Sequence, residues 1–306
     1  MILNNPKVSV IVISLNGEKV IGACLESLSK TEYSPLEILV VNNGSSDSTP
    51  QIVGEQYPTV RLINLPRNLG FAGGNNVGLR VATGDILILL NDDTTVDPQW
   101  VSELVKVMKL NPSVGIAGCK LYYPDGKTLQ HAGGYINSHG LSNHYGKGEI
   151  DQGQCNTLRE VDYVTGAAFA IRKELTLKLG FLDTRYHPIY FEETDYCFRA
   201  RKQGYRVVYV PKSIVCHYES QNTGLGSSGF FFKYHKNRVR FLIRNFTAEQ
   251  LAQAIEPELK WLWSVRRGPE FKPCLKAHAI NLFRFPLLLW HRWSGEYHDW
   301  KNKANA

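Results

Sequence analysis

An apolar run that ends in acids constrains the fold of this chain more than any other feature. Residues 86–90 are five consecutive aliphatic side chains, and Asn91, Asp92 and Asp93 follow them directly. Such a run is typical of a strand covered on both faces, as in the middle of a parallel sheet. Ligands of open α/β sheets bind beyond the carboxyl ends of the strands, where these acids would lie. The stretch therefore predicts a functional site.

The adjacent carboxylates also predict a bound cation. Two neighbouring acids repel each other and lose solvation unless something positive lies beside them. Mg²⁺ or Mn²⁺ favours carboxylate, carbonyl and water oxygens, and often shares its coordination shell with substrate phosphates. The alternative is that Asp92 and Asp93 only open a polar turn, with Asp97-Pro98 capping the next helix.

The alternation of strand and helix patterns predicts the fold class. Apolar runs at residues 8–15, 37–41 and 60–65 precede the acidic strand, with a helical pattern over 18–30. This order predicts an α/β fold with a doubly wound, mostly parallel, Rossmann-like sheet and right-handed crossovers. The first run is followed by Asn16-Gly17 and not by a G-x-G-x-x-G turn, which argues against a nicotinamide or flavin enzyme.

Positive charge is concentrated at the end of the chain. The sequence has 35 Lys and Arg residues and 28 Asp and Glu residues. Residues 230–306 hold 14 of the basic and 6 of the acidic residues, which leaves 21 basic and 22 acidic residues in 1–229. Basic and aromatic residues alternate over 230–246 and 283–293, a composition that suits a helix in a membrane interface. Packing of these helices against the body of the protein is the alternative, because an amphipathic face fits either partner.

Location and redox state are predicted from what the sequence lacks. It contains no apolar run of about 20 residues, and its first residues lack the layout of a signal peptide. We expect a cytoplasmic protein, with peripheral contact at the inner face of the cytoplasmic membrane through the basic end. The six cysteines form no C-x-x-C pair, so free thiols are expected rather than a zinc site or disulfides.

Four sequence blocks resemble family 2 inverting glycosyltransferases of the rhamnosyltransferase-like branch. They are VSVIVISLN at 8–16, VVNNGSSDST at 40–49, NLGFAGGNNVG at 68–78 and GDILILLNDDT at 84–94. The likeness extends over roughly the first 220 residues, and the order of the blocks makes it specific. It implies the GT-A fold, a nucleotide-sugar donor, and a divalent metal (Mn²⁺ or Mg²⁺) at a D-x-D type motif, here Asn91-Asp92-Asp93.

The resemblance also implies residues for the donor side. Asp93 is expected to be the direct metal ligand, with His217 completing the metal shell. Contacts to the nucleotide-sugar are expected from Leu15, Asn16, Asn42, Asp47, Asn75, Asn91 and Asp92. Asp47 has helix capping as its alternative role and Asn75 has turn stabilisation. A structural role is the alternative for His217.

A second acidic cluster, at residues 192–195, supplies the base in this interpretation. Inverting transfer needs a carboxylate that takes the proton of the acceptor hydroxyl. The resemblance places that base at Glu193, leaves Glu192 open as the alternative, and lets Asp195 orient the base or the acceptor. Acids in a first helical turn also favour the helix dipole without any catalytic duty. Arg199 is expected to pair with Asp195.

The acceptor side is less sharply predicted. Thr165 and Gly166, in a small-residue strand expected over 162–171, match the family's acceptor-lining block. Residues 124–160 lack periodicity and are expected to form a long functional loop region over the site. Three histidines there, His131, His139 and His144, have no ligand spacing and are interpreted as surface residues.

These inferences combine into one functional prediction. We expect a catalytic domain over residues 1–229, with a nucleotide-sugar half (1–123) and an acceptor half (124–229), followed by a helical extension over 230–306. Residues 220–229 are expected to be a flap or linker. The chain would transfer a sugar from a UDP- or dTDP-sugar to a saccharide or lipid-linked acceptor in bacterial surface polysaccharide or glycolipid synthesis.

Two other functions compete with this prediction. A nucleotidyltransferase would carry a basic Gly-rich loop after the first strand, and Ser14 to Glu18 do not form one. A nucleic-acid-binding protein is suggested by the basic end, but the body is neutral and the basic residues form no known module. No nucleic-acid partner is therefore expected.

Overall fold

The N-terminal part of the chain alternates strands and helices. The computed structural model describes residues 5–219, 224 and 226–293. Its first elements are β1 (Val8–Ser14), α1 (Ile21–Ser29), β2 (Leu36–Asn42), α2 (Thr49–Gln56), β3 (Arg61–Asn64), α3 (Gly70–Val81) and β4 (Ile86–Asn91). The predicted βαβα order is confirmed, because these apolar runs form a parallel sheet in the order β4-β1-β2-β3.

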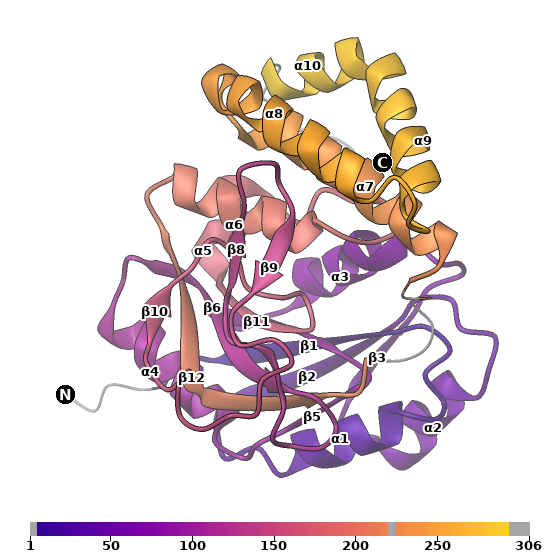
Figure 1. The fold of residues 1–306 in the computed structure, drawn as a ribbon. Coiled ribbons are helices and arrows are strands. Elements are labelled where there is room, and N and C mark those ends of the chain that lie inside the picture. The colour runs from indigo at the N-terminus through magenta and orange to yellow at the C-terminus, as the bar shows by residue number, and fades with distance from the viewer. Residues whose placement is uncertain (1–4, 220–223, 225, 294–306) are drawn as a thin grey trace.

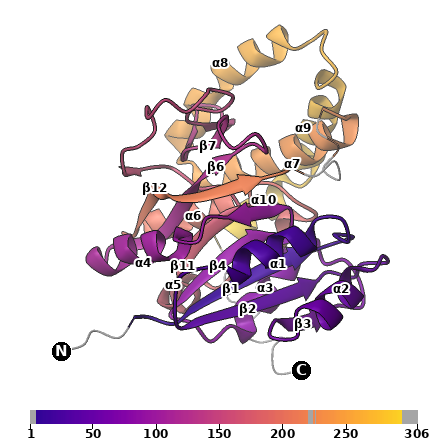
Figure 2. The same ribbon diagram turned by 90° about the horizontal axis from the view of Figure 1, so that it is seen from below.

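The second part continues the same sheet with mixed direction. Its strands are β5 (Thr94–Val96), β6 (Val114–Tyr122), β7 (Leu129–His131), β8 (Gly134–Ile136), β9 (Ser142–His144), β10 (Arg159–Glu160), β11 (Ala168–Arg172) and β12 (Arg206–His217). Its helices are α4 (Trp100–Leu110), α5 (Lys173–Leu179), the 3-10 helix η1 (Thr184–Tyr186) and α6 (Glu192–Lys202). The full sheet has the order β10-β12-β6-β11-β4-β1-β2-β3, with β5 paired to β12 and β7 to β6, whereas β8 and β9 form a separate two-stranded sheet. Helices lie on both of its faces, as Figures 1 and 2 show.

Strand β4 lies inside the sheet, as its apolar run predicts. Residues 86–90 are buried, and they are paired on one side with β1 and on the other with β11. Apolar side chains pack in a core cluster on each face of the sheet. Helix α1 contributes Ile21, Cys24, Leu25 and Leu28 to one of them, at the spacing of a single helical face. Strand β4 thus ends with Asn91 at the carboxyl edge of the sheet, and the packed core on both faces fixes the position of that edge.

Three elements show structural detail that the sequence pattern does not give. Helix α3 begins at Gly70, inside the 68–78 block, because its glycines let the helix pack closely on β1 and β2. The strand expected over 162–171 is limited to β11, which runs antiparallel to both neighbours. Strand β12 contains Pro211 within its length, and the register shift between Val210 and Ile214 accommodates the proline.

The C-terminal segment forms four helices above one edge of the sheet (Figure 1). They are α7 (Ser228–Asn245), α8 (Ala248–Ser264), α9 (Phe271–Phe283) and α10 (Phe285–Trp293). Helix α7 packs on the body, where Phe241 contacts Phe191 and Phe198 and Arg244 pairs with Asp183. Most of the predicted flap at 220–229 lies outside the described residues. Among the described residues, no helix is long and apolar enough to span a bilayer.

The predicted free thiols are confirmed. None of the six cysteines is in a disulfide, and all except the half-buried Cys216 are buried. Burial raises the pKa of Cys24, Cys119 and Cys197 to about 12, so these thiols are protonated at neutral pH. They behave as small apolar core residues.

Helix α3 depends on the absence of a side chain at Gly78. A Cβ there would collide with Ile11 Cγ2 of β1, whereas a Cβ at Gly54 in α2 would meet no atom within 4 Å. We expect Gly78→Ala to destabilise the protein by about 1–3 kcal/mol through overpacking. Gly54→Ala, the matched control, should be neutral or stabilise it by up to about 1 kcal/mol. Urea unfolding followed by circular dichroism measures both changes, and equal midpoints would contradict this packing.

Candidate functional site

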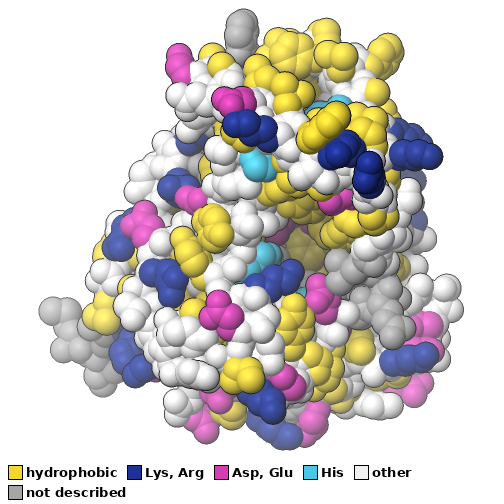
Figure 3. Space-filling view, in the orientation of Figure 1, with side chains coloured by type: hydrophobic (Ala, Val, Ile, Leu, Met, Phe, Trp, Pro, Cys, Tyr) yellow, Lys and Arg dark blue, Asp and Glu magenta, His cyan; other side chains and the backbone are white. Residues whose placement is uncertain are grey.

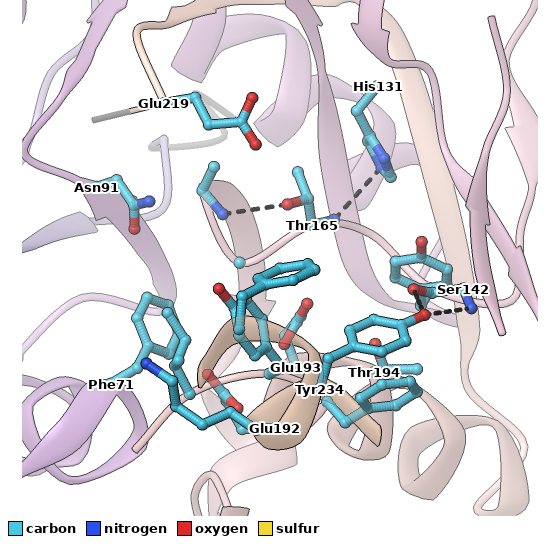
Figure 4. Close-up of a pocket in the computed structure, with 18 of the residues that line it drawn as sticks. Phe71, Asn91, His131, Ser142, Thr165, Glu192, Glu193, Thr194, Glu219 and Tyr234 are labelled. Atoms are coloured by element: carbon cyan, nitrogen blue, oxygen red, sulfur yellow. Dashed lines mark hydrogen bonds between the residues drawn. The ribbon is translucent and has the colours of Figure 1, made fainter. Parts of the chain in front are cut away.

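A cavity of about 910 Å³ opens at the carboxyl edge of the parallel strands. Its walls come from strand ends of the sheet, from residues 130–147, from the start of α6 and from helices α7 and α8. Figure 3 shows the hollow beneath the C-terminal helices, and Figure 4 shows side chains that line it. The predicted site residues that line it are Leu15, Asn91, Asp92, Asp93, Thr165, Gly166, Glu192, Glu193 and His217. The others, Asn16, Asn42, Asp47, Asn75 and Asp195, lie outside this lining.

Backbone pairing brings Asp93 and His217 together. Strand β5 runs antiparallel to β12, with Thr94 opposite His217, and the Tyr218 N–H donates to the Asp93 carbonyl at 2.8 Å. This ladder places Asp93 Oδ1 3.1 Å from His217 Nε2. Both side chains are largely buried, so their contact is screened little by water. Two residues far apart in sequence thus form one polar centre.

The tautomer of His217 is set by Gln130. Its Nδ1 lies 2.7 Å from Gln130 Oε1, and because an amide oxygen only accepts, Nδ1 carries the hydrogen. In the neutral ring the Nε2 lone pair then faces the Asp93 carboxylate, and Asn91 Nδ2 lies 3.4 Å from the same nitrogen. Two acceptors at this separation need a proton or a cation between them. Carboxylate and imidazole donors fit a divalent metal such as Mn²⁺.

Asp92 adds a second carboxylate to this edge. The Ser14 hydroxyl of β1 donates to Asp92 Oδ2 at 2.5 Å. Desolvation raises the pKa of Asp92 to about 7, with a smaller contribution from the charge of Asp93. Gly17 lies close to this carboxylate, and a Cβ there would displace Asp92 Oδ2 and Ser14 Oγ from their present positions. A bound cation would favour the charged form of Asp92.

The two predicted donor residues on the turn after β2 have partners within the protein. Asn42 donates to Asn64 Oδ1 at 2.9 Å and accepts from the Ser45 N–H at 3.0 Å. Asp47 accepts from the Thr49 and Glu18 N–H groups at 3.1 and 3.0 Å, and these bonds lower its pKa. These contacts shape the turn after β2.

Two other predicted donor residues differ in their surroundings. Asn16 has φ 54° and accepts from the Ser46 N–H at 2.9 Å, which ties the end of β1 to the β2 turn. Asn75 is fully buried in α3 and donates to the Phe71 carbonyl at 3.1 Å. Asn43, which follows Asn42 in the sequence, was not among the predicted site residues. It lines the cavity and accepts a hydrogen bond from the Leu69 N–H at 2.9 Å.

The two glutamates at the start of α6 face the cavity with raised pKa values. Desolvation raises the pKa of Glu193 to about 7, although the nearby backbone N–H groups of its own residue, Thr194 and Gly166 favour the charged form. Glu192 is deeper, and burial together with the charge of Glu193 raises its pKa well above the usual range. Tyr190 and Phe191 precede them with φ 85° and 73°, a strained backbone that is common at functional sites.

Asp195, on the same helix, has cationic partners instead. Its carboxylate lies 2.9 Å from Arg199 Nε and 3.3 Å from Arg244 Nε, and it also accepts from the Tyr186 hydroxyl at 3.1 Å. The predicted pairing of Arg199 with Asp195 is confirmed. These contacts tie α6 to α7, so Asp195 is placed to orient the helix that carries Glu193 rather than to meet a ligand.

The interpretation of three histidines as surface residues is wrong. His131 is 1% exposed, and His139 and His144 are half-buried. Strand β7 places His131 in the cavity wall, and the β8–β9 hairpin brings His144 against it. The sequence carries no periodic signal for this arrangement, because residue pairing across short strands depends on tertiary contacts.

The C-terminal helices supply an aromatic wall to the cavity. Phe230, Phe231 and Tyr234 of α7 and Trp261 of α8 line it. Phe230 packs edge-to-face on Tyr190, with ring centroids 5.3 Å apart. The extension is therefore part of the cavity itself, a role that its amphipathic pattern alone did not reveal.

Among the described residues, one cluster elsewhere has metal-ligand chemistry. Glu258, Cys274 and His278 converge between α8 and α9. Both oxygens of Glu258 already accept from Arg238, at 2.7 and 2.5 Å, and one also lies 2.9 Å from His278 Nε2. Because the guanidinium neutralises this carboxylate, we interpret the cluster as a structural ion pair.

Comparison with known proteins identifies relatives of this chain. An uncharacterised protein of Sinorhizobium fredii is 34% identical over 72% of the chain and 25% of its own length. An O-antigen biosynthesis protein of Myxococcus xanthus is 32% identical over 70% of the chain and 17% of its own length. An N-acetylglucosaminyl-diphospho-decaprenol L-rhamnosyltransferase of Mycobacterium tuberculosis is 26% identical over 71% of the chain and 78% of its own length. The chain thus spans a quarter or less of the first two relatives.

Solved structures share the fold at low sequence identity. A Pyrobaculum calidifontis mannosyltransferase in complex with GDP-Man and Mn²⁺ aligns with 96% of the chain and 74% of its own, at 20% identity and a TM-score of 0.57. Staphylococcus aureus TarS in complex with UDP-GlcNAc aligns with 82% of the chain and 71% of its own, at 18% identity and a TM-score of 0.58. The predicted GT-A fold is confirmed. A family model described as glycosyl transferase family 2 matches residues 9–180, more than half of the sequence, and the chain belongs to that family.

Proposed function

We propose that this chain is a metal-dependent inverting glycosyltransferase that transfers a sugar from a nucleotide-sugar to an acceptor hydroxyl. One observation supports this most strongly. A single cavity holds a carboxylate–imidazole pair suited to a metal–diphosphate complex, and also a carboxylate of raised pKa suited to a base. Family membership favours the same reaction class.

On the donor side, Asp93 and His217 would hold the cation, and Asn91 and Asp92 would reach the ribose, the phosphates or their water. Leu15 lines the same part of the cavity and suits the base and ribose. When bound, the cation supplies charge neutralisation for the leaving diphosphate. Asn16, Asn42, Asp47 and Asn75 would act on the donor mainly by fixing the loops around it.

On the acceptor side, Glu193 would act as the general base. Its carboxylate accepts the hydroxyl proton while the acceptor oxygen forms a bond to the anomeric carbon. The bond from that carbon to the diphosphate breaks on the opposite face, so the configuration inverts. A pKa of about 7 lets Glu193 be ionised and still basic at neutral pH. Glu192 is less suited, since its deeper burial favours the protonated form.

Thr165 and Gly166 would line the acceptor pocket beside the base. Gly166 lies where a Cβ would come within 3.0 Å of the Phe71 ring and 3.7 Å of the Glu193 carboxyl carbon. The absence of a side chain therefore keeps the approach to Glu193 open. Asp195 would serve this pocket indirectly, through its contacts with Arg199 and Arg244.

We propose a UDP- or dTDP-sugar as donor and a saccharide or lipid-linked saccharide as acceptor. Two relatives are named for O-antigen biosynthesis and for rhamnosyl transfer to a diphospho-decaprenol acceptor, which supports a role in bacterial surface polysaccharide synthesis. The aromatic wall from α7 and α8 suits the apolar faces of a saccharide or the start of a lipid chain.

The C-terminal helices would also contact an anionic bilayer. Leu282, Phe283 and Leu287 at the α9–α10 junction are 75%, 88% and 48% exposed, and the exposed Arg284 lies among them. Figure 3 shows hydrophobic side chains gathered at the top of the molecule, over the C-terminal helices and away from the hollow. Apolar residues mixed with basic ones suit the headgroup region of an anionic membrane.

The donor site can be tested by calorimetric titration of UDP- and dTDP-sugars with and without Mn²⁺. We expect Mn²⁺-dependent binding, which Asp93→Asn should weaken at least tenfold because a charged ligand is lost. Asp97→Asn, a change at an exposed capping residue, should bind like wild type.

The Glu193→Gln variant tests the base. It should bind the donor normally, yet its rate of transfer to octyl glycosides or diphospho-polyprenol sugars should fall roughly 10²–10⁴-fold. Transfer by Glu193→Gln at the wild-type rate would rule out this base.

The pKa of Glu193 predicts a pH-dependent change in stability. Because its folded pKa of about 7 exceeds the ordinary value of 4.5, the folded state holds its proton more tightly than the unfolded state. Its contribution to stability is therefore present below about pH 4.5 and lost as the pH rises through 7. Without ligands, Glu193→Gln should melt at a higher temperature than wild type at pH 8, with a smaller difference at pH 5. Glu55→Gln, an exposed control, should show no such trend.

The membrane contact can be tested by flotation with vesicles of phosphatidylcholine and phosphatidylglycerol. We expect binding that weakens with salt and with pure phosphatidylcholine. The double variant Leu282→Ser/Phe283→Ser should bind at least about tenfold more weakly, since each side chain contributes on the order of 1.5–3 kcal/mol on burial. Leu110→Ser, at a 72% exposed position on α4, is the matched control. Unchanged binding by the double variant would contradict the proposal.

A further inference from the structure

Two histidines in the cavity wall are hydrogen-bonded ring to ring. His131 Nδ1 lies 2.7 Å from His144 Nδ1, with the rings nearly perpendicular at 82°. Both also contact the ring of Tyr163, at centroid distances of 6.0 and 5.8 Å. The site chemistry described above uses neither histidine, so the pair needs its own explanation.

Backbone hydrogen bonding fixes the tautomers of this pair. The Thr165 N–H donates to His131 Nε2 at 3.3 Å, so that nitrogen carries the lone pair. In the neutral ring His131 then carries its hydrogen on Nδ1 and donates it to His144 Nδ1. His144 must therefore carry its hydrogen on Nε2. Burial and nearby positive charge lower the pKa of both rings, that of His144 to about 4, so both are neutral at pH 7.

The pair is linked to the proposed base through one peptide unit. Thr165, whose N–H donates to His131, is followed by Gly166, where a Cβ would lie 3.7 Å from the Glu193 carboxyl carbon. Figure 4 shows His131 joined to Thr165 by a hydrogen bond, with Asn91 on the other side of Thr165 and Glu193 below Thr165 in this view. The histidines thus lie on the wall that an acceptor approaching Glu193 would face.

The Nε2–H of His144 is available to a ligand. Across residues 5–219, 224 and 226–293, this nitrogen has no hydrogen-bond partner, and His144 lines the cavity. Beside it, the Tyr234 hydroxyl accepts from the Ser142 N–H at 3.1 Å and lies 2.8 Å from Ser142 Oγ. The wall therefore presents a donor of fixed direction next to an ordered hydroxyl pair.

We propose that His131 and His144 form an acceptor-binding pair. His144 donates its Nε2–H to an oxygen of the acceptor sugar, and His131 holds His144 in that tautomer while positioning the Thr165–Gly166 backbone beside Glu193. This inference rests on the proposed glycosyl transfer. A neutral donor suits an uncharged sugar oxygen, and it adds no positive charge that would make Glu193 a weaker base.

The tautomers can be measured without any substrate. In a ¹⁵N-histidine-labelled protein, long-range ¹H–¹⁵N spectra distinguish the two neutral tautomers and the cation. Between pH 6 and 8 we expect His131 protonated on Nδ1 and His144 on Nε2, with signals assigned from the variants His131→Gln and His144→Gln. A His144 ring protonated on Nδ1, or a cationic pair, would overturn the proposal.

Kinetics separate binding of the acceptor from a merely structural role. With an octyl glycoside as acceptor, His144→Phe should lower kcat/KM for the acceptor about tenfold, mainly through KM, because one hydrogen bond is lost. His144→Gln, whose amide can replace the Nε2–H, should recover to within about threefold of wild type. His139→Gln, at a histidine outside the cavity lining, is the control.

The measurements on the donor keep this test separate from that of the proposed function. Mn²⁺-dependent nucleotide-sugar binding, measured by calorimetry, should be unchanged in both His144 variants. If wild type itself binds no nucleotide-sugar, the glycosyltransferase proposal is refuted instead. A His144→Phe variant with unaltered acceptor kinetics, or a His144→Gln variant as impaired as His144→Phe, would overturn the role of the pair.

Discussion

The antiparallel pairing of β5 with β12 is the constraint on which the site depends. Strand β4 brings its polar end out of the core, and the chain then turns so that Thr94 lies opposite His217. The Asp93 carbonyl is held by the Tyr218 N–H within the same ladder. Main-chain pairing therefore brings Asp93 and His217 together, and their side-chain atoms lie 3.1 Å apart. A site built this way is organised before any ligand arrives.

Desolvation acts on every buried acid of the cavity wall, and helix α6 shows how the result depends on neighbouring cations: one carboxyl has a lowered pKa and another has a raised pKa. Asp195 is fully buried but lies beside two arginines, so its charge is compensated and its pKa is lowered. Glu193, two residues earlier, is in no ion pair among the described residues, and burial raises its pKa to about 7. Acids of one helical turn thus divide into a paired, charged carboxylate and a carboxyl group of raised pKa. Buried carboxyl groups with raised pKa values, such as that of Glu193, cluster at functional sites.

Much of the donor side was predictable because it follows from local patterns. An apolar run that ends in acids identifies both a buried strand and the edge where it emerges, and Asn91, Asp92 and Asp93 lie there. The acceptor side depends on contacts without a local pattern. His131 and His144 sit on three-residue strands whose pairing is set by tertiary packing, and Gln130 matters only because His217 lies beside it. The antiparallel direction of β11 was likewise hidden, since burial alone does not specify strand direction.

The central claim is that Asp93 and His217 hold a cation that carries the diphosphate of a sugar donor. Anomalous diffraction from a crystal soaked with Mn²⁺ and UDP or dTDP tests it most directly. We predict one strong manganese peak within about 2.0–2.3 Å of Asp93 and His217 ligand atoms, with diphosphate oxygens completing the shell. A manganese peak only between Glu258 and His278, or none in the cavity while the nucleotide is bound, would contradict the account.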